Sequence, residues 1–163
     1  MTPLQLVVCG TDTDVGKTVV SALLVQGLGA HYWKPVQCGL DPGPEGGGDR
    51  DRVQRWLQLP PQRLLPEAYR LRAPVSPHWA SSLESGDPER PGPPLDPQRL
   101  ELPVVEGPLV VETAGGLLVP LRPDLLQIEH IHDQLRQGWP LELAENNVAV
   151  ITGHCPLRAR RGG

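Results

Sequence analysis

The stretch Gly10-Thr-Asp-Thr-Asp-Val-Gly16-Lys17-Thr18 indicates which fold this chain adopts. It follows the apolar run Gln5–Cys9, which predicts a buried strand, and it leads into Thr18–Leu28, which predicts a helix closed by Gly29. A glycine-rich turn between a strand and a helix is the setting of a phosphate-binding loop, because its backbone N–H groups and the positive end of the helix face phosphate oxygens.

The spacing of this loop differs from the strict phosphate-loop motif. That motif has four residues between its first glycine and the Gly-Lys pair, whereas here five residues separate Gly10 from Gly16. The strand before the loop and the helix after it are nevertheless those of a nucleotide site. We therefore predict nucleotide binding here, and the alternative is a glycine turn that arises by chance.

The rest of the chain alternates short apolar strands with helices. The pattern predicts strands over His31–Val36 and Pro108–Glu112, a last strand between residues 139 and 151, and helices over residues 49–59, 77–84 and 124–137. Residues 60–78 are expected to be irregular, and 85–97 to be a proline-rich surface loop. The alternation predicts an α/β fold of the phosphate-loop NTPase type, a mostly parallel sheet with helices on both faces.

Bulk properties limit the domain count and the classes of function. The 163 residues suit a single domain over 1–163, because too little chain lies on either side of the proline-rich loop for two cores. A net charge of -4 weighs against a nucleic-acid partner. There is no signal-peptide pattern and no apolar run of the ~18 residues that a membrane helix needs. Three cysteines without metal-ligand spacing favour a reducing, cytoplasmic location without a membrane partner.

Three polar segments follow the three clearest predicted strands. They are Gly10–Thr18, Lys34–Gly39 and Glu112–Gly116. In open parallel sheets, ligands bind at the carboxyl ends of the strands. We therefore expect these three segments to meet at one edge of the sheet and to form one site.

Lysine is rare in this chain. Of 15 basic residues, only Lys17 and Lys34 are lysines, and the others are all arginines. A lysine ammonium is a compact charge on a flexible stem, unlike the planar guanidinium of arginine. Lys17 in the phosphate loop is expected to reach the β- and γ-phosphates. Lys34 at a strand end is expected to neutralise charge on a transferring phosphoryl group, and the alternative is an ordinary surface lysine.

Candidate magnesium ligands are oxygen-bearing residues near the phosphate loop, because Mg²⁺ prefers one or two carboxylates together with phosphate and water. The Thr18 hydroxyl and the strand-end carboxylate of Glu112 fit that description. Asp49 and Asp51 open a helix, where a carboxylate either binds a metal or caps the helix. The residue pattern does not choose between these two roles.

Four segments together closely resemble the dethiobiotin synthetase family. They are the longer phosphate loop Gly10–Thr18, Lys34-Pro-Val-Gln-Cys-Gly39, Ala73-Pro-Val-Ser-Pro-His78, and Glu112-Thr-Ala-Gly-Gly116 with Pro120-Leu121 after it. The resemblance implies an ATP-dependent ring closure in which 7,8-diaminononanoate takes up CO₂ as a carbamate. The carbamate then attacks the γ-phosphate, and the second amine closes the cyclic urea with release of ADP and phosphate.

The resemblance also assigns roles to residues. Lys34 would be the catalytic lysine together with Lys17, and Thr13 and Cys38 would face the diamine. Asp49, which matches the family's helix opening better than Asp51, would serve Mg²⁺ with Thr18 and Glu112. The family implies a homodimer as well. The full set of residues expected around ATP is Asp14, Val15, Gly16, Lys17, Thr18, Val19, Asp49, Glu112, Thr113, Ala114 and Gly115.

The chain departs from the family pattern at three places. Cys38 stands where the family has Ser or Thr, and a thiol is a weaker hydrogen-bond partner. Thr113 replaces a glycine, so its side chain is expected to crowd the phosphates. The resemblance is strongest over residues 5–139, and we expect residues 140–163 to be a divergent tail that results from a truncated reading frame. The alternatives are a degenerate fragment that binds nucleotide weakly, and a related ATPase of the partition or cobyrinate-synthase type. For Ser76-Pro77-His78, a packing role is the alternative to a site role.

Overall fold

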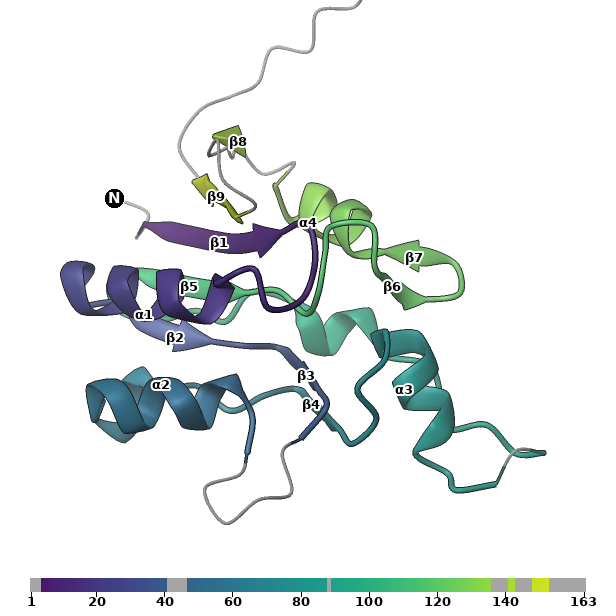
Figure 1. Ribbon diagram of the computed structural model, residues 1–163. Coiled ribbons are helices and arrows are strands. Elements are labelled where there is room, and N and C mark those ends of the chain that lie inside the picture. The colour runs from purple at the N-terminus through teal and green to yellow at the C-terminus, as the bar shows by residue number, and fades with distance from the viewer. Residues whose placement is uncertain (1–3, 41–46, 88, 136–140, 143–147, 153–163) are drawn as a thin grey trace, which may run out of the picture.

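The core of the protein is a five-stranded sheet with the strand order β2-β5-β1-β9-β8 (Figure 1). The computed structural model describes residues 4–40, 47–87, 89–135, 141–142 and 148–152. The strands β1 (Gln5–Gly10), β2 (His31–Trp33) and β5 (Leu109–Glu112) run parallel, while β9 (Val148–Thr152) joins β1 antiparallel and β8 (Leu141–Glu142) joins β9. The predicted α/β class with a parallel centre is confirmed, and the last strand forms at the end of the stretch expected to hold it.

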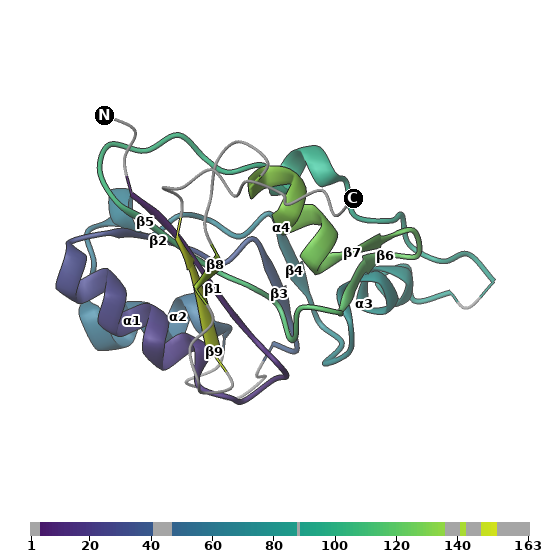
Figure 2. The same ribbon diagram turned by 90° about the horizontal axis from the view of Figure 1, so that it is seen from above.

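Helices cover both faces of this sheet. The side chains of Leu6, Val8 and Val110 pack in one core cluster with residues of α1 (Lys17–Leu28) and α2 (Asp49–Leu57). Val7, Cys9 and Val111 pack in a second cluster with Ile131 of α4 (Gln127–Leu135), and Figure 2 shows α4 across the sheet from α1 and α2. Because strand side chains alternate between faces, only a continuously apolar strand suits a sheet covered on both sides.

The prediction of one strand over His31–Val36 is wrong, because the chain leaves the main sheet at Lys34 and Pro35. Beyond them, β3 (Val36–Cys38) pairs in parallel with β4 (Tyr69–Leu71) in a separate two-stranded sheet. Proline has no N–H to continue a sheet ladder. The Pro35 carbonyl instead accepts hydrogen bonds from the backbone N–H groups of Ala68 and Tyr69. The stretch predicted to be irregular therefore contains a strand.

The remaining elements lie around the two sheets already described. They are the 3₁₀ turns η1 (Pro61–Arg63) and η2 (Pro97–Leu100), the helix α3 (Pro77–Leu83), and the hairpin of β6 (Pro120–Arg122) and β7 (Leu125–Leu126). The predicted helix over 124–137 starts later, at Gln127, because residues 125–126 belong to the hairpin, and its predicted end lies outside the described residues. Helix α2 ends two residues early at Leu57. None of the described helices is long and apolar enough to span a membrane.

Candidate functional site

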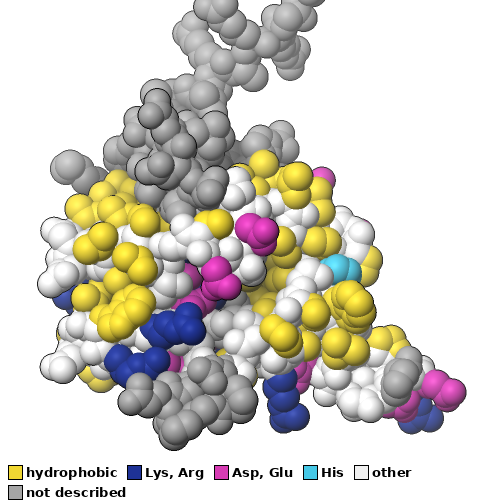
Figure 3. Space-filling view, in the orientation of Figure 1, with side chains coloured by type: hydrophobic (Ala, Val, Ile, Leu, Met, Phe, Trp, Pro, Cys, Tyr) yellow, Lys and Arg dark blue, Asp and Glu magenta, His cyan; other side chains and the backbone are white. Residues whose placement is uncertain are grey.

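A deep cleft lies where β1, β2 and β5 end. It encloses about 1710 Å³ of space, part of it open to solvent. Figure 3 shows acidic and basic side chains close together near the middle of this face, with hydrophobic side chains on both sides. All three polar segments that follow the predicted strands contribute to its wall, through Asp12, Thr13, Asp14, Gly16, Lys17, Thr18, Val19, Lys34, Gln37, Cys38, Gly39, Glu112, Ala114, Gly115 and Gly116. The structure therefore brings these segments together at one edge of the sheet.

The phosphate loop has the backbone conformation that its glycine requires. Gly16 adopts φ 99°, in the left-handed region that glycine tolerates and other residues rarely adopt, and Asp14 is also left-handed at φ 55°. Helix α1 begins directly afterwards at Lys17, and no side chain caps its first turn. Its first backbone N–H groups therefore carry the partial positive charge that favours an anion at this position.

Lys17 lies in the same loop and is buried. Its Nζ donates a hydrogen bond to the carbonyl of Asp12, so the ammonium folds back over the loop. Burial, and to a smaller extent the charge of Lys34, lowers the pKa of Lys17. The fold thus holds the Lys17 ammonium where burial disfavours its charge, and a bound anion would offset that cost.

The second lysine joins two carboxylates at the centre of the cleft. Lys34 Nζ lies 2.7 Å from Asp49 Oδ2 and 2.9 Å from Glu112 Oε1, and it is 5% exposed. Burial alone would lower the pKa of Lys34, but Glu112 and Asp49 outweigh burial and raise it. Burial likewise opposes ionisation of Asp49, yet Lys34 lowers the pKa of that carboxyl. The ammonium is therefore charged at any physiological pH.

The carboxylates around Lys34 have the chemistry of a magnesium site. The Thr18 hydroxyl donates to Glu112 Oε1 at 2.8 Å, and it lies close enough to Asp49 to lower the pKa of that carboxyl. Two carboxylates thus meet at the Lys34 ammonium, with the Thr18 hydroxyl beside them. This is the oxygen donor set that Mg²⁺ takes beside nucleotide phosphates, so the residues present fit the ion.

The structure separates the two aspartates at the start of α2. Asp51 Oδ2 accepts the backbone N–H of Gly48, the residue before α2, at 2.8 Å, and it also pairs with Arg70. Asp49 instead lines the cleft, and its own N–H donates to Gln37 Oε1 at 2.8 Å. Asp51 is therefore a helix cap, and Asp49 faces Lys34.

The opposite wall of the cleft comes from the small sheet and α3. Cys38, Ser76 and Pro77 line it, while Thr13 approaches from the phosphate loop. Burial raises the pKa of the Cys38 thiol to about 12, against the opposing effect of Lys34. Cys38 is therefore a neutral thiol. Ser76 Oγ lies 3.0 Å from Nδ1 of His78, which does not line the cleft.

Two residues expected to bind the nucleotide point elsewhere. The side chain of Val15 packs against the core cluster beneath α1. Only the backbone of Val15, which is part of the phosphate loop, is left for the nucleotide. Thr113 is buried, its hydroxyl donates to the carbonyl of Val8, and it lines a different cavity. Because Glu112 faces the cleft and side chains alternate along the chain, the Thr113 side chain faces away from the place where we expected it to crowd the phosphates.

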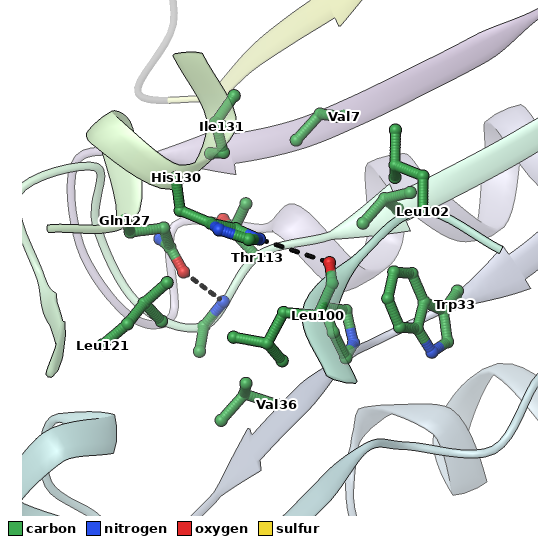
Figure 4. A pocket seen from close by; sticks show the side chains of 13 residues that line it. Val7, Trp33, Val36, Leu100, Leu102, Thr113, Leu121, Gln127, His130 and Ile131 are labelled. Carbon is green, nitrogen blue, oxygen red and sulfur yellow. Dashed lines mark hydrogen bonds between the residues drawn. The ribbon is translucent and has the colours of Figure 1, made fainter. Parts of the chain in front are cut away.

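That second cavity, beneath α4, holds about 520 Å³ of empty space, part of it open to solvent (Figure 4). Apolar side chains dominate its wall, and none of the described residues lining it is Lys, Arg, Asp or Glu. Gln127 crosses its rim: its Oε1 accepts the N–H of Ala114 at 3.2 Å, and its Nε2 donates to the carbonyl of Gly116 at 2.9 Å. The cavity lacks the charged groups of the cleft, so the cleft is the candidate active site.

Sequence reasoning missed several residues of the site. Tyr32 hydrogen-bonds Glu112, Gln37 holds the first N–H of α2, and Arg52 and Trp56 extend the cleft along α2. Tyr32 could have been found, because it precedes Lys34 by two positions and extended chains place such residues on one face. No comparable signal identifies Gln37 or Gln127.

Comparisons with known proteins match most of the described chain. The family model described as AAA domain matches residues 4–135. An ATP-dependent dethiobiotin synthetase of Rhodopseudomonas palustris (strain BisB18) is 50% identical over 129 residues, which are 79% of this chain and 56% of the relative. Its counterpart in Brucella ovis is 48% identical over 122 residues, 75% of this chain and 52% of the relative. The chain thus spans about half the length of the curated relatives it matches.

Proposed function

Because the chain belongs to the AAA domain family and is similar to ATP-dependent dethiobiotin synthetases, we propose that it carboxylates 7,8-diaminononanoate with CO₂ and closes the cyclic urea with consumption of ATP. The observation that carries this proposal is the meeting of Lys17, Lys34, Thr18, Asp49 and Glu112 in one cleft. A phosphoryl transfer that activates a carbamate needs positive charge at the phosphates and at the attacking oxygen.

The phosphate loop and α1 provide the nucleotide half of the site. The backbone from Asp14 to Val19 would wrap the phosphates, and Lys17 would exchange its hydrogen bond to the Asp12 carbonyl for a phosphate oxygen. The loop Ala114–Gly115 closes the cleft from the other side. Thr18, Asp49 and Glu112 would hold Mg²⁺, which neutralises phosphate charge when bound.

Lys34 would act between the two substrates. Its ammonium stays protonated because Glu112 and Asp49 raise its pKa, so it provides charge and does not accept a proton. Bound between carbamate and γ-phosphate, a fixed cation stabilises the negative charge that develops as the anhydride forms. Lys34 would then turn from Asp49 and Glu112 to the substrate, since those two carboxylates would hold Mg²⁺.

The diamine would lie against the wall formed by the small sheet. Thr13 and Cys38 are the polar groups that we assign to it. Since the thiol is neutral, Cys38 offers one weak hydrogen bond and neither a nucleophile nor a base. We also propose a homodimer, by likeness to the family, and light scattering of the purified chain measures its mass.

A direct assay tests the proposal. Purified protein is mixed with ATP, Mg²⁺, bicarbonate and the diamine, phosphate release is followed, and dethiobiotin is detected by mass spectrometry. We expect phosphate release that requires the diamine. Nucleotide binding without diamine-dependent phosphate, in protein that circular dichroism shows to be folded, would instead support a nucleotide-binding chain without turnover.

A further inference from the structure

The carboxylate of Glu112 is fully buried, and each of its oxygens has its own partners. Oε1 accepts hydrogen bonds from Thr18 and Lys34 at 2.8 and 2.9 Å. Oε2 accepts one from the hydroxyl of Tyr32 at 2.9 Å. The exposed fraction is 0% for both Glu112 and Tyr32. The two oxygens are therefore not equivalent: one faces Thr18 and the Lys34 ammonium, and the other faces a phenol in the core.

Tyr32 reaches Glu112 from the neighbouring strand. It pairs with Val110 in the parallel ladder of β2 and β5, and its ring belongs to the core cluster beneath α1 and α2. A buried phenol hydroxyl needs a partner to offset the loss of water. Burial, followed by the charge of Glu112, raises the pKa of Tyr32 well above its usual value, so the hydroxyl remains a donor.

We propose that Tyr32 is a positioning residue that fixes the rotation of the Glu112 carboxylate, with Oε1 held toward Thr18 and Lys34 for the cation. The terminal torsion of a glutamate is broad and does not choose an orientation by itself. Here a donor on Oε2 makes the choice. The inference deepens the proposed function, because it names the residue that prepares Glu112 for Mg²⁺. Partners behind metal-binding residues commonly set metal affinity in this way.

The closing experiment compares two tyrosine variants. Tyr32→Phe removes the hydroxyl and keeps the ring. Tyr69→Phe is the matched control, because its hydroxyl accepts a backbone N–H from Asp96 and does not line the cleft. ATP affinity is measured by calorimetry with Mg²⁺ and again with EDTA. For Tyr32→Phe we expect affinity with Mg²⁺ to fall about 10- to 100-fold while affinity in EDTA stays the same, and for Tyr69→Phe we expect no change in either.

Two results would overturn the inference. One is a Tyr32→Phe protein whose ATP affinity depends on Mg²⁺ as in the wild type. The other is an equal loss of ATP affinity with and without Mg²⁺, which would make Tyr32 merely structural. If the wild-type chain shows no Mg²⁺-dependent binding, the proposed function and this inference both fall. If it binds Mg²⁺ with ATP but makes no dethiobiotin, only the proposed function falls.

A spectroscopic measurement covers the case in which Tyr32→Phe does not fold. The chain has two tyrosines, so Tyr69→Phe protein grown with 3-fluorotyrosine gives a single fluorine resonance, that of Tyr32. We expect this resonance to shift when Mg²⁺ and ATP are added together, because the partners of Glu112 change, and to stay in place with ATP in EDTA. A resonance that ignores Mg²⁺ with saturating ATP would refute the positioning role.

Discussion

Replacing Lys34 by methionine should destabilise the protein strongly at neutral pH. The ammonium is the shared partner of two carboxylates, at 2.7 Å from Asp49 and 2.9 Å from Glu112. Methionine fills similar space but offers no charge, so both carboxylates would be left without their cation in a largely buried site. Breaking a buried pair in this way costs about 3–5 kcal/mol.

The structure places the expected loss at the lower end of that range. The Asp49 side chain keeps 17% of its surface exposed, and Arg52 Nη1 lies 3.2 Å from its other oxygen, so water and a second cation offset part of the cost. Glu112 retains hydrogen bonds from Thr18 and Tyr32. We therefore expect a loss of about 3 kcal/mol, which corresponds to a fall in Tm of roughly 6–12 °C for a domain of this size.

The loss should depend on pH in a defined direction. In the wild type, Lys34 lowers the pKa of Asp49, so this carboxylate adds stability above its unfolded-state pKa, and that stability is lost as pH falls through the folded value. Lys34 itself, with a raised pKa, adds stability that is lost only as pH rises through its folded value. In the variant, burial raises the pKa of Asp49 instead, and protonation then favours the folded state. The difference in unfolding free energy between wild type and Lys34→Met should therefore decrease from neutral pH toward about pH 4.

Urea unfolding of both proteins at several pH values measures this difference in unfolding free energy. Lys17→Met is the matched control, because the pKa of Lys17 is lowered and its charge therefore opposes folding. We expect that control to keep the wild-type midpoint or to exceed it. A Lys34→Met protein as stable as wild type at pH 7.5, or a loss that is the same at every pH, would refute the reasoning.

Three further outcomes are expected. Lys17→Ala should abolish ATP binding in calorimetry, while Lys34→Ala should bind ATP and lose diamine-dependent phosphate release; near-normal turnover in Lys34→Ala would show that its catalytic role is wrong. Cys38 should react slowly with iodoacetamide at pH 7.5 in native protein, because a pKa of about 12 leaves very little thiolate; rapid labelling found by mass spectrometry would contradict this. Gln127→Leu should weaken ATP binding and lower stability by about 1–3 kcal/mol, because it leaves the buried N–H of Ala114 without its partner and removes one of the two hydrogen bonds to the Gly116 carbonyl; an unchanged affinity would mean that the loop holds its shape alone.

The parts of the fold that were predictable are those that local sequence determines. β1 and β5 are buried on both faces, so each is a continuous apolar run that any reading of the sequence detects. Helix α1 follows from the glycine loop before it. In contrast, β3 and β4 have three residues each, and each is a strand only because it pairs with the other, which lies about thirty positions away in the sequence. No local pattern encodes such a pairing.

The same distinction applies to the site. Residues at strand ends were predictable, because the direction of a parallel sheet brings those ends together. Gln37 and Gln127 read as ordinary residues of a strand and a helix, and their contacts depend on tertiary packing. Thr113 was assigned to the nucleotide by the family resemblance, whereas its side chain faces away from the cleft, because adjacent residues in extended chain face opposite ways.

Because the chain leaves the main sheet at Lys34 and Pro35, the residues of the cleft come from two different sheets. The groups assigned to the nucleotide and the cation stand mainly on the large sheet and its helices, whereas Cys38 and the start of α3 belong to the small one. An engineer who exchanged β3, β4 and α3 for those of another protein, but kept Gln37 on the N–H of Asp49, would thus change the wall that we assign to the diamine and leave the residues assigned to Mg²⁺ in place. Lys34, at the junction, is the residue such a graft has to preserve.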